Sequence, residues 1–388
     1  MTHRSSITFV YCAVALLFAG PQVFAAQGSQ EVAPYREPFR QSFPIREAQH
    51  RQIKDYVDRV LQEQADRALV AVTPDFTSPA AYEKSLEPYR ARLRAHFGTP
   101  PPQAKSHATL TKLEQVAEDR DATIYRIWIE VVPGVDAYGL YLVPRQRPSS
   151  GKVPLLIAQH GGGGNPEAIQ DLDTRINYHS FGREAVRRGY AVWAPALAMR
   201  CGYCDDPPIA AATRELLDQK LKLAGTSIIG LEVHKIIAST EALLRVRAEL
   251  DPERVGMTGL SWGGFFTMYV TALAPWVKVA APSGYFRDHA DQLARAAADD
   301  AKLAERDIAG ALGHAQAVAL IAPRPILIQL GEKDGAINPL KGARREAARA
   351  ASYYERLGLS DRFTFQIHPG GHEFDTPAIL DFFDRHLR

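Results

Sequence analysis

Two glycine-rich motifs, far apart in the chain, contain the residue types that acyl transfer requires. Residues 160–164 are a histidine followed by four glycines, and residues 259–263 read G-L-S-W-G. The second motif fits the nucleophile elbow, in which a serine sits on a tight turn between a strand and a helix, and the glycines allow the backbones to approach closely. Ser261 is therefore the candidate nucleophile.

The acid that would accompany this serine is expected downstream, in a turn after a buried strand. Residues 325–330 form an apolar run of strand length, and the turn that follows it reads G-E-K-D-G. Asp334 in this turn is the candidate acid. Glu332 lies two residues earlier and is the alternative.

The general base is expected last in the chain, after a further strand. Residues 363–367 have strand character, and the following loop contains Gly370 and Gly371, which permit a sharp turn. His372, directly after these glycines, is the candidate base. His368 lies nearer the strand end and is the alternative.

Each residue type suits its role. A serine hydroxyl needs an imidazole to take its proton, and histidine has an ordinary pKa of about 6.5 that lets it accept and return one. A buried carboxylate would fix the imidazole tautomer. The expected oxyanion hole consists of the backbone N–H of Trp262 and one from Gly162 or Gly163. His160 is expected to orient the glycine run.

Other chemistries fit these motifs poorly. The two histidines 368 and 372 have H-x-x-x-H spacing, but the intervening Pro-Gly-Gly breaks the helix that a zinc protease site would need. No Lys-Ser or Lys-Thr follows the glycine run, so it is not a phosphate-binding P-loop. We therefore expect neither a metal nor a cofactor.

The elements around the motifs predict an α/β fold. Apolar stretches at 153–158 and 254–258 read as buried strands that end at the two glycine motifs, and residues 264–269 open a helix. A parallel sheet binds ligands at the carboxyl edge of its strands, which is where both motifs would lie. Antiparallel strands are expected at 109–116, 123–131 and 137–143, and helices at 46–97, 227–248 and 288–313. Tyr285 and Phe286, together with Trp262, are expected to face the substrate.

The first 25 residues read as a secretory signal. Arg4 precedes an apolar core at 7–19, and small residues permit cleavage near Ala25. The expected organisation is a signal peptide at 1–25, a helical extension at 26–105 and a catalytic domain at 106–388. The mature protein would be exported, to the periplasm or the medium, without a stable membrane span.

Cys201 and Cys204 are the two cysteines of the expected mature chain. In an oxidising compartment they can pair, and we expect a local disulfide that stiffens an active-site loop, with two free thiols as the alternative. No helix start follows the C-x-x-C pair, so a thioredoxin-like redox role is not favoured.

Charge and composition indicate an ordinary globular protein. The net charge of +2 falls to +1 once Arg4 leaves with the signal, and no basic stripe marks a nucleic-acid partner. The expected partner is an ester substrate. The sequence does not indicate an oligomeric state.

The motifs at 160–164, 259–264, 331–334 and 370–374 together resemble the α/β-hydrolase superfamily. Within it, the chain is similar to exported bacterial acetyl xylan esterases and dienelactone-hydrolase-like proteins. This resemblance implies an α/β-hydrolase fold, with a mostly parallel central sheet and helices on both faces. It also implies a carboxylic ester hydrolase that removes acetyl or similar acyl groups from plant polysaccharide. Dienelactone hydrolases use a cysteine nucleophile, whereas this elbow carries Ser261, so their lactone hydrolysis is not implied.

Two other functions share these motifs. A peptidase of the prolyl-oligopeptidase type has the same order of triad residues, although the amino-terminal part of this chain shows no propeller-like repeat. A hydrolase that has lost activity and serves as a binding protein is the other alternative. Such proteins usually lack a triad member, and here each is present.

Overall fold

The computed structural model describes residues 35–38, 40–68, 72–146, 151–162, 164–172, 176–197, 211–297, 312–335 and 340–388. The expected signal peptide, the cysteine pair and Gly163 lie outside these residues. The chain divides into two compact units, 1–53 and 54–388. In the first unit, the guanidinium of Arg46 lies 4.8 Å from the ring centre of Phe43. The second unit holds the residues of the candidate site.

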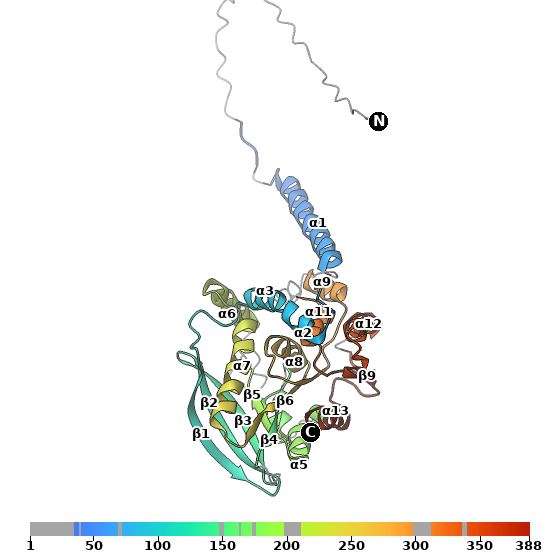
Figure 1. The fold of residues 1–388 in the computed structure, drawn as a ribbon. Helices are drawn as coiled ribbons and strands as arrows, with labels where there is room; N and C mark the ends of the chain where they lie inside the picture. Colours follow the sequence, from blue (N-terminus) through green and yellow to red (C-terminus); the bar gives the residue numbers. More distant parts are fainter. Residues whose placement is uncertain are drawn as a thin grey trace, which may run out of the picture. The chain divides into compact units, whose positions relative to one another are not determined.

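A single sheet organises the second unit. In the described part of the chain, nine strands are joined in the order β1-β2-β3-β5-β4-β6-β7-β8-β9 (Figure 1). Their bounds are β1 Thr109–Glu118, β2 Ala122–Val132, β3 Val135–Pro144, β4 Val153–Gln159, β5 Ala191–Pro195, β6 Leu250–Leu260, β7 Val279–Ser283, β8 Ile326–Gly331 and β9 Phe363–His368. Strands β1, β2 and β3 pair antiparallel with their neighbours, and β3 pairs antiparallel with β5. The pairs from β5 through β4 and β6 to β9 are parallel. The predicted α/β fold with a mostly parallel sheet is confirmed.

The register of the parallel strands brings the sequence motifs to one edge. Gln159, directly before His160 and the glycine run, is opposite Gly259 at the elbow. Leu260 is opposite Ser283 on the next strand. At the far side, Gly331 is opposite His368, so the turns that contain the acid and the base begin side by side. Parallel strands end at the same edge, and this is why motifs distant in sequence meet.

Helices cover both faces of this sheet. The described helices are α1 Phe43–Ala68, α2 Pro79–Ser85, α3 Glu87–Phe97, α4 Pro166–Ile169, η1 Ile176–Tyr178, α5 Phe181–Arg187, α6 Ala211–Leu223, α7 Ile228–Val246, α8 Trp262–Leu273, α9 His289–Ala297, α11 His314–Ile321, α12 Leu340–Arg356, η3 Ser360–Arg362 and α13 Thr376–Leu387. Apolar side chains of α2, α3, α7, α8, α11 and α12 form the buried core of one face. Those of α4, α5 and α13 form the core of the other. The helix predicted at 288–313 corresponds in its first part to α9, and residues 298–311 lie outside the described chain.

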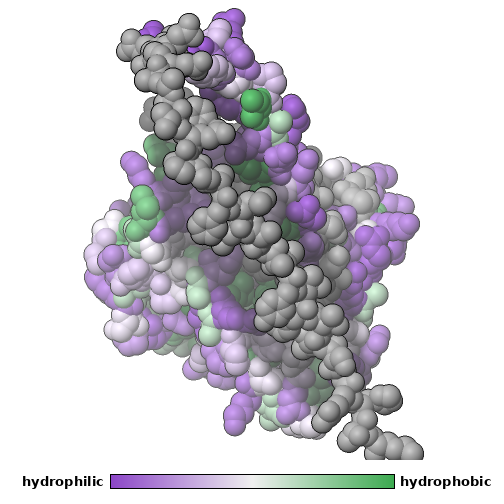
Figure 2. Space-filling view, turned by 90° about the horizontal axis from the view of Figure 1, so that it is seen from above, coloured by the Kyte–Doolittle hydropathy of each residue, from purple (hydrophilic) through white to green (hydrophobic). Residues whose placement is uncertain are grey.

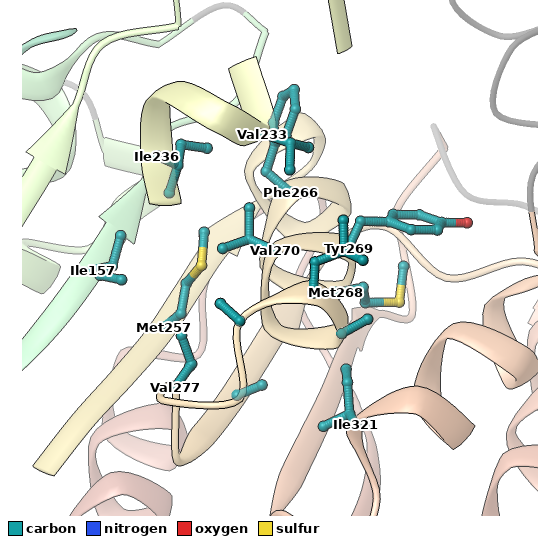
Figure 3. Close-up of a cluster of buried hydrophobic side chains, with 14 of the residues drawn as sticks. Ile157, Val233, Ile236, Met257, Phe266, Met268, Tyr269, Val270, Val277 and Ile321 are labelled. Atoms are coloured by element: carbon teal, nitrogen blue, oxygen red, sulfur yellow. The ribbon is translucent and has the colours of Figure 1, made fainter. Parts of the chain in front are cut away.

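Helix α8, which follows the elbow, is buried on all sides. Figure 3 shows its side chains between Met257 of β6, Ile236 of α7 and Ile321 of α11. A helix that is apolar around its whole circumference belongs in a core. The end of α8 is held by the partly buried Arg324, which donates to the carbonyls of Thr271, at 2.8 Å, and of other residues near the helix end. The helix that presents the candidate nucleophile therefore has little freedom to move.

Helices α2 and α3 share this core. The Tyr82 hydroxyl donates to the carbonyl of Ala319 at 2.8 Å, and the Phe97 ring lies edge-on to Tyr269, with ring centres 5.5 Å apart. Gly230 of α7 lies directly against the carbonyl of Phe97, where a methyl group would not fit. Although the sequence suggests a boundary near 105, these two helices pack into the same compact unit as the sheet.

The described residues on the face in Figure 2 are mostly hydrophilic, with hydrophobic residues singly or in small groups. Within the described ranges, no helix combines the length and apolarity that crossing a bilayer requires.

Candidate active site

Ser261 occupies the sharp turn between β6 and α8. Its backbone has φ 60° and ψ −121°, a conformation that is strained for a residue with a side chain. Its N–H donates to the carbonyl of Ser283 on β7 at 2.9 Å, which fixes the turn to the neighbouring strand. A Cβ on Gly263 would lie 2.0 Å from the carbonyl oxygen of Gln159, so this position of the motif must be glycine. The predicted elbow geometry is present.

His372 is hydrogen-bonded to Asp334. The two atoms His372 Nδ1 and Asp334 Oδ2 lie 2.7 Å apart. The Asp334 side chain is fully buried, while the His372 side chain is 32% exposed. Because the carboxylate can only accept, Nδ1 carries the hydrogen, and Nε2 is left with a lone pair. This is the tautomer that a general base needs.

The two alternatives are arranged differently. Glu332 is exposed, and its N–H donates to the carbonyl of His368, which continues the ladder between β8 and β9. The ring of His368 accepts a hydrogen bond from the N–H of Gly370 at 3.2 Å, and it lines a cavity that does not include His372 or Ser261. The structure thus pairs His372 with Asp334, as the sequence suggests.

The His372 ring lies beside the elbow. A methyl group on Gly284 would be 3.1 Å from Cε1 and 3.3 Å from Nδ1 of His372. Gly284 directly follows Ser283, whose carbonyl binds the N–H of Ser261. The buried Asp334, the His372 ring and the elbow therefore lie in sequence at the carboxyl edge of the sheet.

The glycine run is folded against Ser261. The N–H of Gly164 donates to the carbonyl of Gly161 at 3.1 Å, which closes a turn with Gly162 at its first central position. We call residues 161–164 the glycine turn. A Cβ on Gly161 would lie 3.1 Å from Cβ of Ser261 and 2.8 Å from the carbonyl of Leu260, so glycine allows the close approach.

The backbone donors of this region differ in what they bind. The N–H of Gly161 donates to the Tyr178 hydroxyl at 2.8 Å, and Ser261 uses its own N–H within the sheet. These two are therefore not the oxyanion donors. Trp262 is the first residue of α8, and the positive end of a helix dipole favours developing negative charge. Trp262 directly follows Ser261, and Gly162 directly follows Gly161, which lies against Ser261, while Gly163 lies outside the described residues.

His160 is a buried structural residue. Its Nδ1 donates to the carbonyl of Gly161, and its Nε2 accepts from the N–H of Leu197, each at 2.9 Å. Burial lowers the pKa of His160 to about 4, so the ring is neutral near neutral pH. It joins the start of the glycine turn to the segment after β5, in agreement with the orienting role expected from the sequence.

The aromatic residues predicted to face the substrate fall into two groups. Phe286 is 0% exposed, and its ring packs against His314 and Phe365. It is a core residue, which corrects the expectation that it contacts the substrate. Tyr285 is partly exposed, directly after Gly284, with its ring centre 6.0 Å from that of Trp262. Trp262 itself is 7% exposed.

Three residues near the site carry no signal in the sequence. Tyr178 binds the glycine turn, and Glu373 accepts from the N–H of Gly371 at 2.9 Å and lies 2.8 Å from Nε2 of His179. The Gly371 N–H and His179 lower the pKa of the Glu373 carboxyl. In the described ranges, no group of three His, Cys, Asp or Glu side chains is arranged to hold a metal ion.

The chain is similar in sequence to known hydrolases. The model of the dienelactone hydrolase family matches residues 173–353. The protein YtaP of Bacillus subtilis (strain 168), whose assignment as a hydrolase is provisional, is 24% identical over 269 residues, which cover 68% of this chain and 86% of YtaP.

Solved structures of esterases have the same fold. A protein from Bacteroides fragilis NCTC 9343, provisionally assigned as an acetyl xylan esterase, matches with a TM-score of 0.59 at 16% identity, over 81% of each chain. A glucuronoyl esterase of carbohydrate esterase family 15 from Caldicellulosiruptor kristjansonii matches with a TM-score of 0.55 at 18% identity, over 81% of this chain and 90% of the esterase. At these identities the matches show a shared fold. The chain has the fold of these esterases, and residues 173–353 are similar to the dienelactone hydrolase family.

Proposed function

We propose that this protein is an exported serine esterase that acts through Ser261, His372 and Asp334. The observation that carries the proposal is the hydrogen bond from His372 to the buried Asp334, on a ring that lies against Gly284 beside the strained Ser261. A serine alone at a tight turn would need neither an oriented imidazole nor a buried carboxylate. The three together are the arrangement that activates a hydroxyl for acyl transfer.

The proposed reaction has two halves. His372 Nε2 takes the hydroxyl proton as Ser261 Oγ attacks the ester carbonyl, and the imidazolium is stabilised by Asp334. The tetrahedral oxyanion is held by the N–H of Trp262 and one N–H from the glycine turn. Each donor stabilises the transition state by about 3 kcal/mol. His372 returns the proton to the leaving alcohol. Water then attacks the acyl-enzyme by the same route and releases the acid.

The proposed substrate is an acylated polysaccharide. The structural neighbours include an acetyl xylan esterase from Paenibacillus sp. R4 and glucuronoyl esterases, and their common feature is an ester attached to a carbohydrate. The exported state proposed from the first 25 residues is consistent with a substrate outside the cell. Acetyl and similar small acyl groups are the groups expected to be transferred to Ser261 and then released as the free acid.

Two experiments test this proposal. A fluorophosphonate probe should label the protein, and the label should disappear in Ser261→Ala. A panel of p-nitrophenyl esters, acetylated xylan and chromogenic peptides should show turnover of the esters and the xylan. Hydrolysis of peptides alone would favour the peptidase alternative, and a folded protein without labelling or turnover would favour a binding protein.

A further inference from the structure

A short segment with an unusual backbone lies between the glycine turn and the loop of the candidate base. His179 has φ 46° and Ser180 has φ 56°, two consecutive non-glycine residues in the left-handed region. Such residues cost conformational energy and persist where the surrounding structure holds them. We call residues 177–180 the bridging segment.

On one side, the bridging segment holds the glycine turn. The Tyr178 hydroxyl accepts the N–H of Gly161 at 2.8 Å. A Cβ on Gly164 would lie only 2.2 Å from the same hydroxyl. Both ends of the glycine turn therefore lie against the Tyr178 hydroxyl. Tyr178 is 2% exposed and its ring is edge-on to Phe374, with ring centres 5.7 Å apart. Its hydroxyl is thus fixed in position by packing.

On the other side, the bridging segment holds the loop that contains His372. The carbonyl of Asn177 accepts the N–H of Phe374 at 2.9 Å, and His179 Nε2 lies 2.8 Å from Glu373 Oε2. The second carboxylate oxygen of Glu373 accepts the N–H of Gly371. The contacts therefore flank His372 in the chain, at Gly371 before it and at Glu373 and Phe374 after it.

Packing alone does not fix this loop. A cavity of about 610 Å³ lies next to it, lined by His179, Glu184, His368, Gly370 and Glu373 among others. Backbone hydrogen bonds from Lys333 to Gly370 and from Phe374 to Asn177 hold parts of the loop. The side-chain contacts of Glu373 with Gly371 and His179 add a restraint on the side that borders the cavity.

We infer that the bridging segment fixes the glycine turn and the His372 loop relative to each other, with Tyr178, His179 and Glu373 as positioning residues. None of these side chains needs to touch the substrate. During the reaction, His372 must transfer a proton while the glycine turn stabilises the oxyanion. The distance between the base and the oxyanion donors therefore affects the rate. This inference rests on the proposed function of Ser261 and His372.

The test is a double-mutant cycle on turnover. Tyr178→Phe removes the hydroxyl but keeps the ring, and Glu373→Ala removes both carboxylate contacts. Each should lower kcat for p-nitrophenyl acetate by about tenfold or more, with little change in KM. If both act through one link, the double variant should lose about as much as the more impaired single variant. Two losses that multiply, or kcat values within about twofold of the parent, would overturn the inference.

Controls separate positioning from stability and from the proposed function. Glu184→Ala is matched to Glu373→Ala, because Glu184 lines the same cavity and pairs instead with Arg187 of its own helix. It should leave kcat unchanged. Glu373→Gln keeps an acceptor for Gly371 and should recover much of the activity. If Tyr178→Phe does not fold, the exposed His179→Ala replaces it in the cycle. Activity in Ser261→Ala would contradict the proposed function itself, whereas a dead Ser261→Ala beside fully active Tyr178 and Glu373 variants would contradict this inference alone.

Discussion

His372 Nδ1 lies 2.7 Å from Oδ2 of Asp334, and this contact distinguishes two carboxylates that the sequence could not separate. Glu332 and Asp334 belong to one turn after β8. The N–H groups of Glu332 and Lys333 still bind carbonyls of the β9 end and its following loop, so the chain leaves the ladder only at Asp334. The carboxylate at that point is buried, and the one two residues earlier is exposed.

Asp334→Asn should therefore abolish most activity. An amide can donate to Nδ1, which favours the imidazole tautomer with its hydrogen on Nε2, where the serine proton must go. Loss of the acid in a triad of this kind lowers kcat by about 10⁴-fold. Steady-state turnover of p-nitrophenyl acetate measures the effect. Glu332→Gln is the matched control, and a larger loss there than in Asp334→Asn would exchange their roles.

Gly161→Ala should lower turnover by moving the glycine turn. The added methyl would lie 2.8 Å from the carbonyl of Leu260 and 3.1 Å from Cβ of Ser261. Neither atom can move without changing the elbow, so the glycine turn must shift. Misplacement on the scale of 1 Å costs about 100-fold in rate. Gly335→Ala adds the same methyl where nothing lies within 4 Å, and it should remain active. Equal rates for the two variants would show that the close approach is unimportant.

The residues of the candidate triad could be proposed from the sequence because the topology of a parallel sheet brings the ends of its strands to one edge. Buried strands appear as apolar runs, and the polar residues that follow them meet at one edge, which is how Ser261, Asp334 and His372 were predicted. The role of Tyr178 depends on a packing contact with the distant Gly161, and no local pattern indicates it. The left-handed backbone of His179 and Ser180 is likewise a result of tertiary contacts.

Tyr285 and Phe286 differ in burial in a way that the sequence alone could not predict. Both are aromatic, both follow β7, and the sequence gives no reason to separate them. A difference of one position in the chain turns Phe286 toward His314 and Phe365 in the core, while Tyr285 stays partly exposed near Gly284. Which side chain points inward depends on helix α11 and strand β9, which come later in the chain.

These two residues should consequently respond differently to truncation. Tyr285→Ala should raise KM for bulky esters and lower the free energy of unfolding by less than Phe286→Ala does, because Tyr285 is only partly buried. Phe286→Ala should lower the free energy of unfolding by about 3–5 kcal/mol, because it leaves a cavity in a closed core. Urea unfolding and KM values over a series of acyl chain lengths measure both. A Phe286→Ala variant with normal stability would place this ring outside the core.

Acid should destabilise the fold through its buried neutral histidines. Burial lowers the pKa of His160 to about 4 and that of His314 to about 3, below the ordinary value of about 6.5 expected in the unfolded chain. Between these values the unfolded chain binds more protons than the native protein, so stability is present above pH 6.5 and is lost as the pH falls toward the folded pKa. At pH 5 the loss is roughly 2 kcal/mol for each such histidine.

The measurement is the free energy of unfolding in urea at pH 7 and at pH 5. In His314→Gln the difference between the two pH values should shrink by roughly 2 kcal/mol, whatever the variant costs at pH 7, because glutamine does not titrate. His96→Gln, at an exposed position on α3, controls for the replacement of a histidine by glutamine. Its free energy of unfolding should change between pH 7 and pH 5 by as much as that of the parent. His314 is enclosed by Tyr285, Phe286 and Gln292, so a difference that stays at the parent's value in His314→Gln would mean that water reaches the ring and that this part of the core opens before the protein unfolds.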